Sequence, residues 1–348
     1  MACGRYSGDK TMPDQAIVIG IGSYPTFGAN GASPNSLPGA VQDAEDVAEW
    51  LHRNTPAAVT LITSTHCNGA PWTVTNLLAA RPVTSDVDTA FKPYVTSTAP
   101  KVGDRLYVYT AGHGLAPDPR SRCLIMADAM GINWVPNLEI PAWFDWFANQ
   151  SHFDELILWM DCCGTQALEY ARTKPAGLAN TASRPPPPAK VFMAFASGFG
   201  RSSYEGPIGP GGMMRGLFTD RLLKGLNGAA ADASGEVRSK SLANFLRNGG
   251  LNGAGGEAQF AAVPQEDDML FAIRAHPIYR IRAMRPDGAL VPDGTVLELT
   301  NPFVPLLKTA QADQGWVSFA VGVGLYKLSG GGVDRLIEIG ATTPVDIE

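Results

Sequence analysis

The chain has 348 residues, of which 45% are hydrophobic and 17% are charged, and its formal net charge is -6. Its Lys and Arg are scattered, so the sequence offers no basic surface for nucleic acid, and no apolar run reaches the roughly 18 residues of a membrane span. The five cysteines are odd in number and two are adjacent, which is a poor disulfide framework and favours a reducing, cytoplasmic location.

The amino-terminal part predicts alternating strands and helices. Residues 16–22 form a short apolar run typical of a buried strand. Residues 39–51 repeat apolar side chains at three- and four-residue spacing, which is typical of an amphipathic helix. A second strand is predicted over residues 59–63, and two helical segments over residues 73–81 and 86–98, interrupted by Pro82 and Pro93.

Two later strands end in chemically reactive residues. The run from Asp104 to Thr110 leads into Gly112-His113-Gly114, and the run from Leu156 to Met160 leads into Asp161-Cys162-Cys163. Uninterrupted apolar runs indicate strands buried on both faces of a parallel sheet, and reactive groups gather at the carboxyl edge of such sheets. The sequence thus places a histidine and a thiol pair at strand ends.

Between the two reactive strands, a short strand is predicted over 123–127 and a helix over 140–150. After the second, a helix starts at residue 164, a proline-rich linker follows over 173–190, and a strand is predicted over 191–197. The rest of this part is predicted to contain a glycine-rich loop over 198–216, helices over 217–226 and 242–247, a loop over 254–265 and a strand over 269–273. After residue 275 the pattern changes to short strands that alternate apolar and polar residues, with turn residues between them. This predicts a small β-sandwich-like module over residues 276–348.

His113 and Cys163 form a candidate catalytic dyad. A surface histidine and an inert buried thiol are the more common fates of such residues. The glycines that flank His113 and the two adjacent cysteines at a strand end favour a catalytic role. A right-handed crossover would also bring both strand ends to one edge of the sheet. A neighbouring imidazole converts a thiol into the nucleophilic thiolate. The N–H of Gly114 is a candidate oxyanion donor.

Cofactor chemistry is not expected. The histidines lie far apart and no CxxC pair exists, which argues against zinc. The Gly20-Ile21-Gly22 stretch is no dinucleotide fingerprint, because Pro25 stands where the third glycine is required.

These stretches together resemble the caspase and metacaspase superfamily of cysteine peptidases, particularly its bacterial caspase-like members. The residues Tyr109 to Gly114 are similar to the family's histidine box, and Asp161-Cys162-Cys163 to its nucleophile box. On this match Cys163 is the nucleophile, and its own N–H joins Gly114 in the oxyanion hole. Gly164-Thr165-Gln166 departs from the His-Ser-Gly with which the family often continues, which puts the leaving-side contacts in doubt.

The resemblance covers about residues 14–275 and implies a mostly parallel six-stranded sheet flanked by helices. The change of pattern, which is independent of the resemblance, adds the C-terminal all-β module and divides the chain into a peptidase domain over residues 1–275 and the module over 276–348. Within the domain the resemblance implies a large-subunit-like part over 14–172, the linker over 173–190 and a small-subunit-like part over 191–275. Self-cleavage in the linker is a further hypothesis.

The resemblance also suggests a substrate class. Asp161 occupies the place of the acid with which metacaspases read Arg or Lys at P1, and Glu205 is a candidate second acid. The alternative is that Asp161 caps a following helix. Calcium activates some metacaspases, but no EF-hand-like spacing exists here, so no metal ligands are assigned and calcium stays open.

The expected function is a cysteine endopeptidase that acts on a protein or peptide substrate. The alternative is a catalytically inactive caspase-like scaffold that binds a partner protein, and a thiol acyltransferase ranks third. The C-terminal module contains no reactive constellation, so we expect it to offer a docking surface for a regulatory protein, or to be a structural cap.

Overall fold

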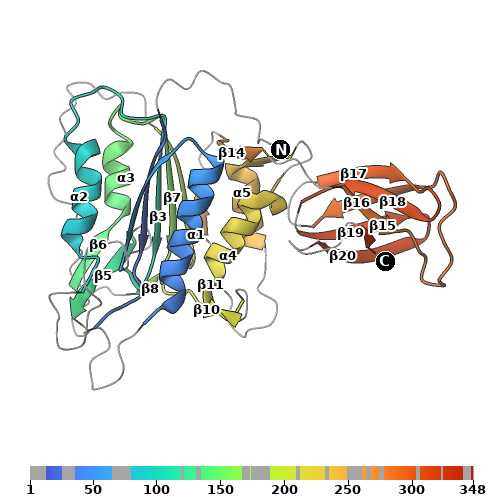
Figure 1. Cartoon of the computed structure of the whole chain (residues 1–348), viewed down its shortest axis with the longest axis horizontal. Coiled ribbons are helices and arrows are strands. Elements are labelled where there is room, and N and C mark those ends of the chain that lie inside the picture. Colours follow the sequence, from blue (N-terminus) through green and yellow to red (C-terminus); the bar gives the residue numbers. More distant parts are fainter. Residues whose placement is uncertain are drawn as a thin grey trace. The chain divides into compact units, whose positions relative to one another are not determined.

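The computed structural model of the chain describes residues 13–25, 36–64, 80–118, 121–130, 135–166, 173, 189–208, 212–231, 235–248, 261–263, 268–273, 278–302, 306–322, 324–339 and 346–347 (Figure 1). The predicted helix over 73–81 and the predicted linker over 173–190 lie mostly outside these residues. The chain divides into two compact units: Met1–Asp220 with Gly253–Asp267, and Arg221–Asn252 with Asp268–Glu348. The predicted boundary near residue 275 lies inside the second unit and stays a prediction.

The first unit is built on a six-stranded sheet with the order β13-β9-β7-β3-β1-β2. Five strands run parallel and the edge strand β13 is antiparallel to β9. The mostly parallel six-stranded sheet flanked by helices that was predicted from the sequence is confirmed by this order. The strands are β1 (Gln15–Gly20), β2 (Ala58–Thr63), β3 (Arg105–Ala111), β7 (Glu155–Asp161), β9 (Lys190–Phe195) and β13 (Ala261–Val263).

The identity of the sixth strand differs from the prediction. Residues 254–265 were predicted to be a loop, yet β13 lies within them. The predicted last strand is present as β14 (Leu270–Ile273), but it pairs with β12 (Glu236–Arg238) in the second unit. Because β13 is only three residues long, no apolar run reveals it, and its pairing with the edge of β9 decides its structure.

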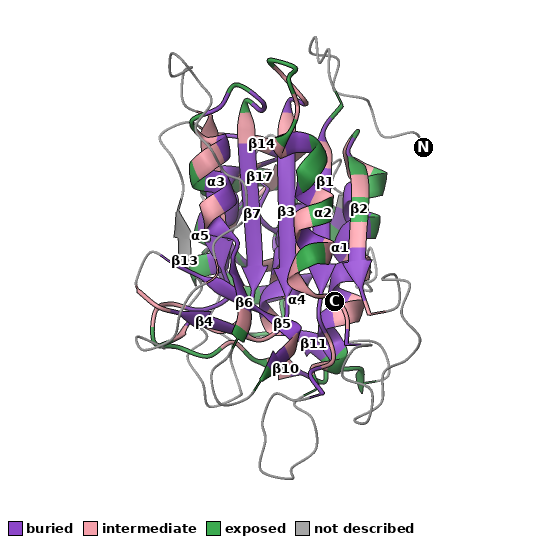
Figure 2. Cartoon of the chain, turned by 90° about the vertical axis from the view of Figure 1, so that its left-hand side faces the viewer, coloured by how far each residue is buried: buried purple, intermediate pink, exposed green. Residues whose placement is uncertain are grey.

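Burial on both faces explains why the central strands are continuous apolar runs. Six of the seven residues of β7 are buried, as are six of the seven in β3 (Figure 2). On one face the helices α2 (Thr84–Val95) and α3 (Pro141–Phe147) meet through Phe91 and Trp143, whose rings stack at 3.9 Å. On the other face Trp159 of β7 meets Trp50 of α1 (Pro38–Asn54), with ring centroids 6.3 Å apart.

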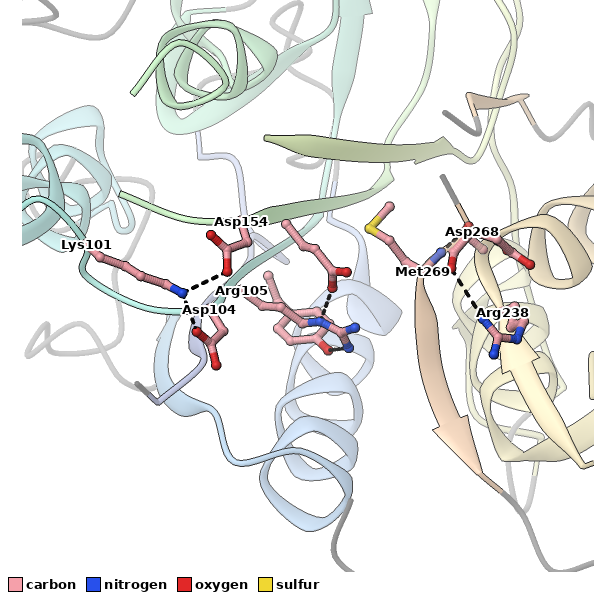
Figure 3. A network of polar contacts seen from close by, with 10 residues as sticks. Lys101, Asp104, Arg105, Asp154, Arg238, Asp268 and Met269 are labelled. Atoms are coloured by element: carbon pink, nitrogen blue, oxygen red, sulfur yellow. Dashed lines mark hydrogen bonds and ion pairs between the residues drawn. The ribbon is translucent and has the colours of Figure 1, made fainter. Parts of the chain in front are cut away.

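The amino ends of β3 and β7 are held by ion pairs. Lys101 bridges Asp104 and Asp154, each at 2.7 Å (Figure 3). Arg105 at the start of β3 pairs with Glu155 at the start of β7. Helix α2 runs two residues past Pro93, although the sequence predicts an interruption at that proline.

A second sheet lies beyond the carboxyl ends of β3 and β7. It has the order β6-β5-β4-β8 and comprises β4 (Gly114–Ala116), β5 (Cys123–Met130), β6 (Val135–Glu139) and β8 (Thr165–Gln166). The prediction that a helix starts at residue 164 is wrong, because β8 pairs in parallel with β4. Two short strands, β10 (Glu205–Gly206) and β11 (Arg215–Gly216), form a hairpin that leads into α4 (Leu217–Lys224).

The second unit contains the π-helical turn η3 (Gly225–Ala229), α5 (Ser239–Asn248) and the β12–β14 pair. Asp268 receives hydrogen bonds at the start of α5 from the Ser239 hydroxyl and the Lys240 N–H, both at 3.1 Å, and its carbonyl accepts from Arg238 (Figure 3).

The C-terminal strands form a three-stranded sheet, β18-β15-β21, and a four-stranded sheet, β17-β16-β19-β20. Three of these strands, β17, β19 and β21, were not predicted from the sequence. The strands are β15 (Ile278–Arg282), β16 (Val296–Asn301), β17 (Leu306–Gln311), β18 (Trp316–Ala320), β19 (Gly324–Gly330), β20 (Val333–Ile339) and β21 (Asp346–Ile347). Within the described residues, no helix combines the length and the apolar composition required to cross a bilayer.

Candidate active site

The pairing register brings the segments of His113 and Cys163 together. Strands β3 and β7 pair in parallel up to the partners Ala111 and Asp161. The same offset of fifty residues reappears beyond the sheet edge, where Leu115 of β4 pairs with Thr165 of β8. His113 and Cys163 occupy corresponding positions between these two ladders. Because paired strands lie about 4.8 Å apart, the two residues stand on adjacent segments at the same level.

Gly112 and Gly114, on either side of His113, lie so close to neighbouring atoms that a side chain does not fit at either position. A Cβ on Gly112 would lie 2.5 Å from the Tyr24 hydroxyl. A Cβ on Gly114 would lie 2.7 Å from both the Cβ of Cys162 and the carbonyl oxygen of Cys163. The absence of side chains on both sides of His113 therefore lets the histidine segment lie directly against the cysteine segment.

Tyr24 contacts His113 in two ways. The backbone N–H of His113 donates to the Tyr24 hydroxyl at 2.8 Å. The two rings also pack together, with centroids 4.7 Å apart and planes tilted by 55°. Tyr24 is fully buried, and this burial raises its pKa well above the ordinary value, so the hydroxyl stays protonated.

The two adjacent cysteines have different surroundings. Cys163 is partly exposed, and its sulfur accepts a hydrogen bond from the Ser203 N–H at 3.4 Å. The Ser203 hydroxyl lies 3.6 Å from the same sulfur. Cys162 is buried, and desolvation raises the pKa of its thiol. Cys163 is therefore the sulfur that solvent and a substrate can reach, whereas Cys162 is protected.

The segment after the nucleophile is held by backbone contacts. The N–H of Gly164 donates to the Ser197 hydroxyl at 2.7 Å and to the Arg201 carbonyl at 2.8 Å. A Cβ on Gly164 would lie 2.4 Å from the Gly198 carbonyl oxygen. Because of this crowding, no larger side chain fits at position 164 without a shift of the backbone.

Three carboxyl groups converge beside the dyad. A Cβ on Gly216 would lie 2.1 Å from Asp161 Oδ2 and 2.8 Å from Asp43 Oδ2, so both carboxylates face the same point. Glu205 is held at the start of α1, where the N–H groups of Gly39 and Ala40 donate to it. This last contact gives Glu205 a structural role as well, because an acid is favoured at a helix N-terminus.

Burial shifts the ionisation of all three acids. It raises the pKa of Asp161 to about 7, that of Asp43 to about 6 and that of Glu205 to about 6, and the neighbouring carboxylate charges raise each further. Hydrogen bonds oppose the shifts. Thr219 donates to Asp161 Oδ2 from its hydroxyl at 2.6 Å, and Arg215 donates to Asp43 Oδ1 at 2.5 Å.

The dyad residues and the acids line one pocket of about 100 Å³. This volume is far below the several hundred Å³ of typical cofactor pockets, so the pocket suits a single side chain. Its described lining includes no Lys or Arg. The lining residues are Leu37, Ala40, Asp43, Ala111, Gly112, His113, Asp161, Cys163, Ser203, Tyr204, Glu205 and Gly216.

The structure thus brings His113, Cys163, Asp161 and Glu205 into one pocket. Gly114 lies against the carbonyl of Cys163, but the oxyanion roles of Gly114 and Cys163 stay predictions. Residues 165–166 after Asp161 form β8, but Asp161 Oδ2 accepts the Thr219 N–H at 3.3 Å in the first turn of α4, so the helix-capping alternative for Asp161 stays open beside a substrate-binding role.

Two residues of the site, Tyr24 and Asp43, were not predicted as site residues from the sequence. For Asp43 a signal existed, because it is a carboxylate on the apolar, buried face of α1, next to Ala40 and Ala44. Nothing in the sequence marks Tyr24.

Comparisons with known proteins give distant similarities. No family model matches the chain. Among curated proteins, a chain from a Desulfuromonadales bacterium, named a probable protease, is 29% identical over 238 residues, which are 62% of this chain and 26% of that protein. This chain therefore spans about a quarter of that relative.

Solved structures with similarity include caspase-1 from Spodoptera frugiperda, at 12% identity and a TM-score of 0.49, covering 79% of this chain and 97% of that one. A structural-genomics protein from Geobacter sulfurreducens is 14% identical, with a TM-score of 0.44, covering 73% of this chain and 95% of that one.

Proposed function

We propose that the chain is a cysteine endopeptidase of the caspase-like kind, in which Cys163 is the nucleophile and His113 the general base. The observation that carries the proposal is the common offset of the two ladders, β3–β7 and β4–β8, because this offset favours neighbouring positions for His113 and Cys163 at the carboxyl edge of the sheet. The shared pocket and the protease name of the curated relative support it.

The proposed reaction uses these two side chains and the surrounding backbone. The His113 imidazole takes the thiol proton, and the Cys163 thiolate attacks the scissile carbonyl carbon to form a C–S bond. The resulting oxyanion accepts hydrogen bonds from the N–H groups of Gly114 and Cys163. The C–N bond then breaks as the imidazolium gives its proton to the leaving amine. Water, activated by His113, hydrolyses the thioester and releases the second product.

The acidic pocket supports a preference for Arg or Lys at P1. Asp161, Asp43 and Glu205 lie in it, and a basic side chain would offset the burial and the carboxylate charges that raise the pKa values of Asp161 and Glu205. Arg215 pairs with Asp43 and with Asp46 on α1, so Asp161 and Glu205 are the acids left for a substrate cation. A carboxylate pair binds a guanidinium through charge-assisted, bidentate hydrogen bonds.

Active-site labelling tests the dyad. A peptidyl acyloxymethyl ketone with Arg at P1 is expected to modify Cys163 in the wild-type protein, and His113→Ala is expected to slow this modification strongly. Cys163→Ala is the control and should take no label at that peptide. Absence of labelling in a folded wild-type protein would favour the inactive scaffold instead.

The P1 preference is tested with fluorogenic peptides that differ only at P1. We expect kcat/KM to be highest for Arg and Lys, lower for Gln and lowest for Asp. A like charge in a desolvated acidic pocket is strongly unfavourable, so faster cleavage after Asp would refute the assignment of this pocket.

A further inference from the structure

We propose that Tyr24 is a positioning residue for the His113 imidazole, a role that rests on the proposed function and specifies how its general base is held. Tyr24 follows β1, about ninety residues before His113, and it contacts both the backbone and the ring of the histidine.

The hydroxyl fixes the turn on which His113 stands. It accepts the His113 N–H at 2.8 Å inside the protein, where water does not compete. The Gly112 backbone passes so close that even a methyl group would lie 2.5 Å from the same oxygen. The hydroxyl therefore determines how the chain leaves β3 and enters β4, and with it the direction in which the His113 side chain starts.

The ring restricts the imidazole itself. Its centroid lies 4.7 Å from that of the imidazole, within the range of favourable tilted ring pairs. Because Tyr24 is fully buried, it cannot move aside, so the imidazole is supported on one side while it lines the pocket. A base held in this way needs no reorganisation before it takes the thiol proton.

A purely structural role is the alternative, since a fully buried tyrosine also contributes to the core. The two roles differ in what they change: a core residue alters the stability of the fold, whereas a positioning residue also alters the pH dependence of the thiol. Tyr107 offers a matched control. It is buried in β3 as well, and its hydroxyl accepts a hydrogen bond from Arg105 at 3.2 Å near the amino end of the strand.

The experiment measures the rate at which iodoacetamide alkylates Cys163 between pH 5 and pH 10, followed by mass spectrometry of the Cys163 peptide. The proteins are wild type, Tyr24→Phe, Tyr107→Phe and His113→Ala, each at a temperature where its near-UV circular dichroism shows a folded chain. This readout needs no peptide substrate.

We expect Tyr24→Phe to lower the alkylation rate at pH 6 about tenfold, the effect of one lost buried hydrogen bond, while the rate at pH 10 stays unchanged. Tyr107→Phe should follow the wild-type profile. A Tyr24→Phe profile equal to wild type, together with an altered His113→Ala profile, overturns the role of Tyr24 alone. A His113→Ala profile equal to wild type overturns the dyad and this role with it.

Discussion

Replacing Asp161 by Asn should stabilise the fold at alkaline pH, because Asp161 is a buried acid whose ionisation is costly. Its pKa is raised to about 7, first by burial and then by the charge of Asp43. The amide is isosteric, and its oxygen can still accept the Thr219 hydroxyl, now bonded at 2.6 Å. The substitution thus removes the charge and keeps the hydrogen bond.

The sign follows from proton linkage. Between pH 4 and pH 7 the folded chain keeps a proton on Asp161 that the unfolded chain has released, so the stability that this group contributes is lost as the pH rises through its folded pKa. An increase of about three in pKa corresponds to about 4 kcal/mol, which is an upper limit for the gain of Asp161→Asn at pH 8. At pH 4 the gain should vanish.

Urea unfolding at pH 5 and pH 8 measures this difference. Asp154→Asn is the control, because Asp154 is mostly exposed in its pair with Lys101 and should change stability by less than about 1 kcal/mol at either pH. Two results would show that ionisation of Asp161 does not destabilise the fold. One is a lower free energy of unfolding for Asp161→Asn than for wild type at pH 8, and the other is a stability difference that does not grow between pH 5 and pH 8.

The remaining predictions concern reactivity and packing. In the native protein iodoacetamide should modify Cys163 but leave Cys162 unmodified, because burial shields that thiol and raises its pKa; peptide mass spectrometry reads the sites. Gly114→Ala should cost about 1–3 kcal/mol in thermal unfolding and slow alkylation of Cys163, since its Cβ meets atoms at 2.7 Å. Arg215→Leu should cost about 3–5 kcal/mol in urea unfolding by leaving Asp43 buried and unpaired, and Asp43→Asn in the same chain should recover much of it.

The sequence indicated the central sheet because burial on both faces leaves a local trace. Strands such as β7 and β3 must be apolar throughout, so the runs Leu156 to Met160 and Leu106 to Tyr109 could be recognised without knowing their neighbours. The strand β13 left no such trace. Its three residues form a strand because they pair with the free edge of β9. The local sequence of a segment does not show that such an edge is available.

The same distinction holds for the site. His113 and Cys163 could be proposed from the sequence because each directly follows a strand, and parallel strands end at one edge. Asp43 and Ser203 reach the pocket, and Tyr24 reaches His113, by the folding of distant segments onto that edge. Local pattern determined which strands form and where they end. Only the tertiary structure decided which side chains surround the sulfur, because contacts between segments remote in sequence depend on the packing of the whole unit.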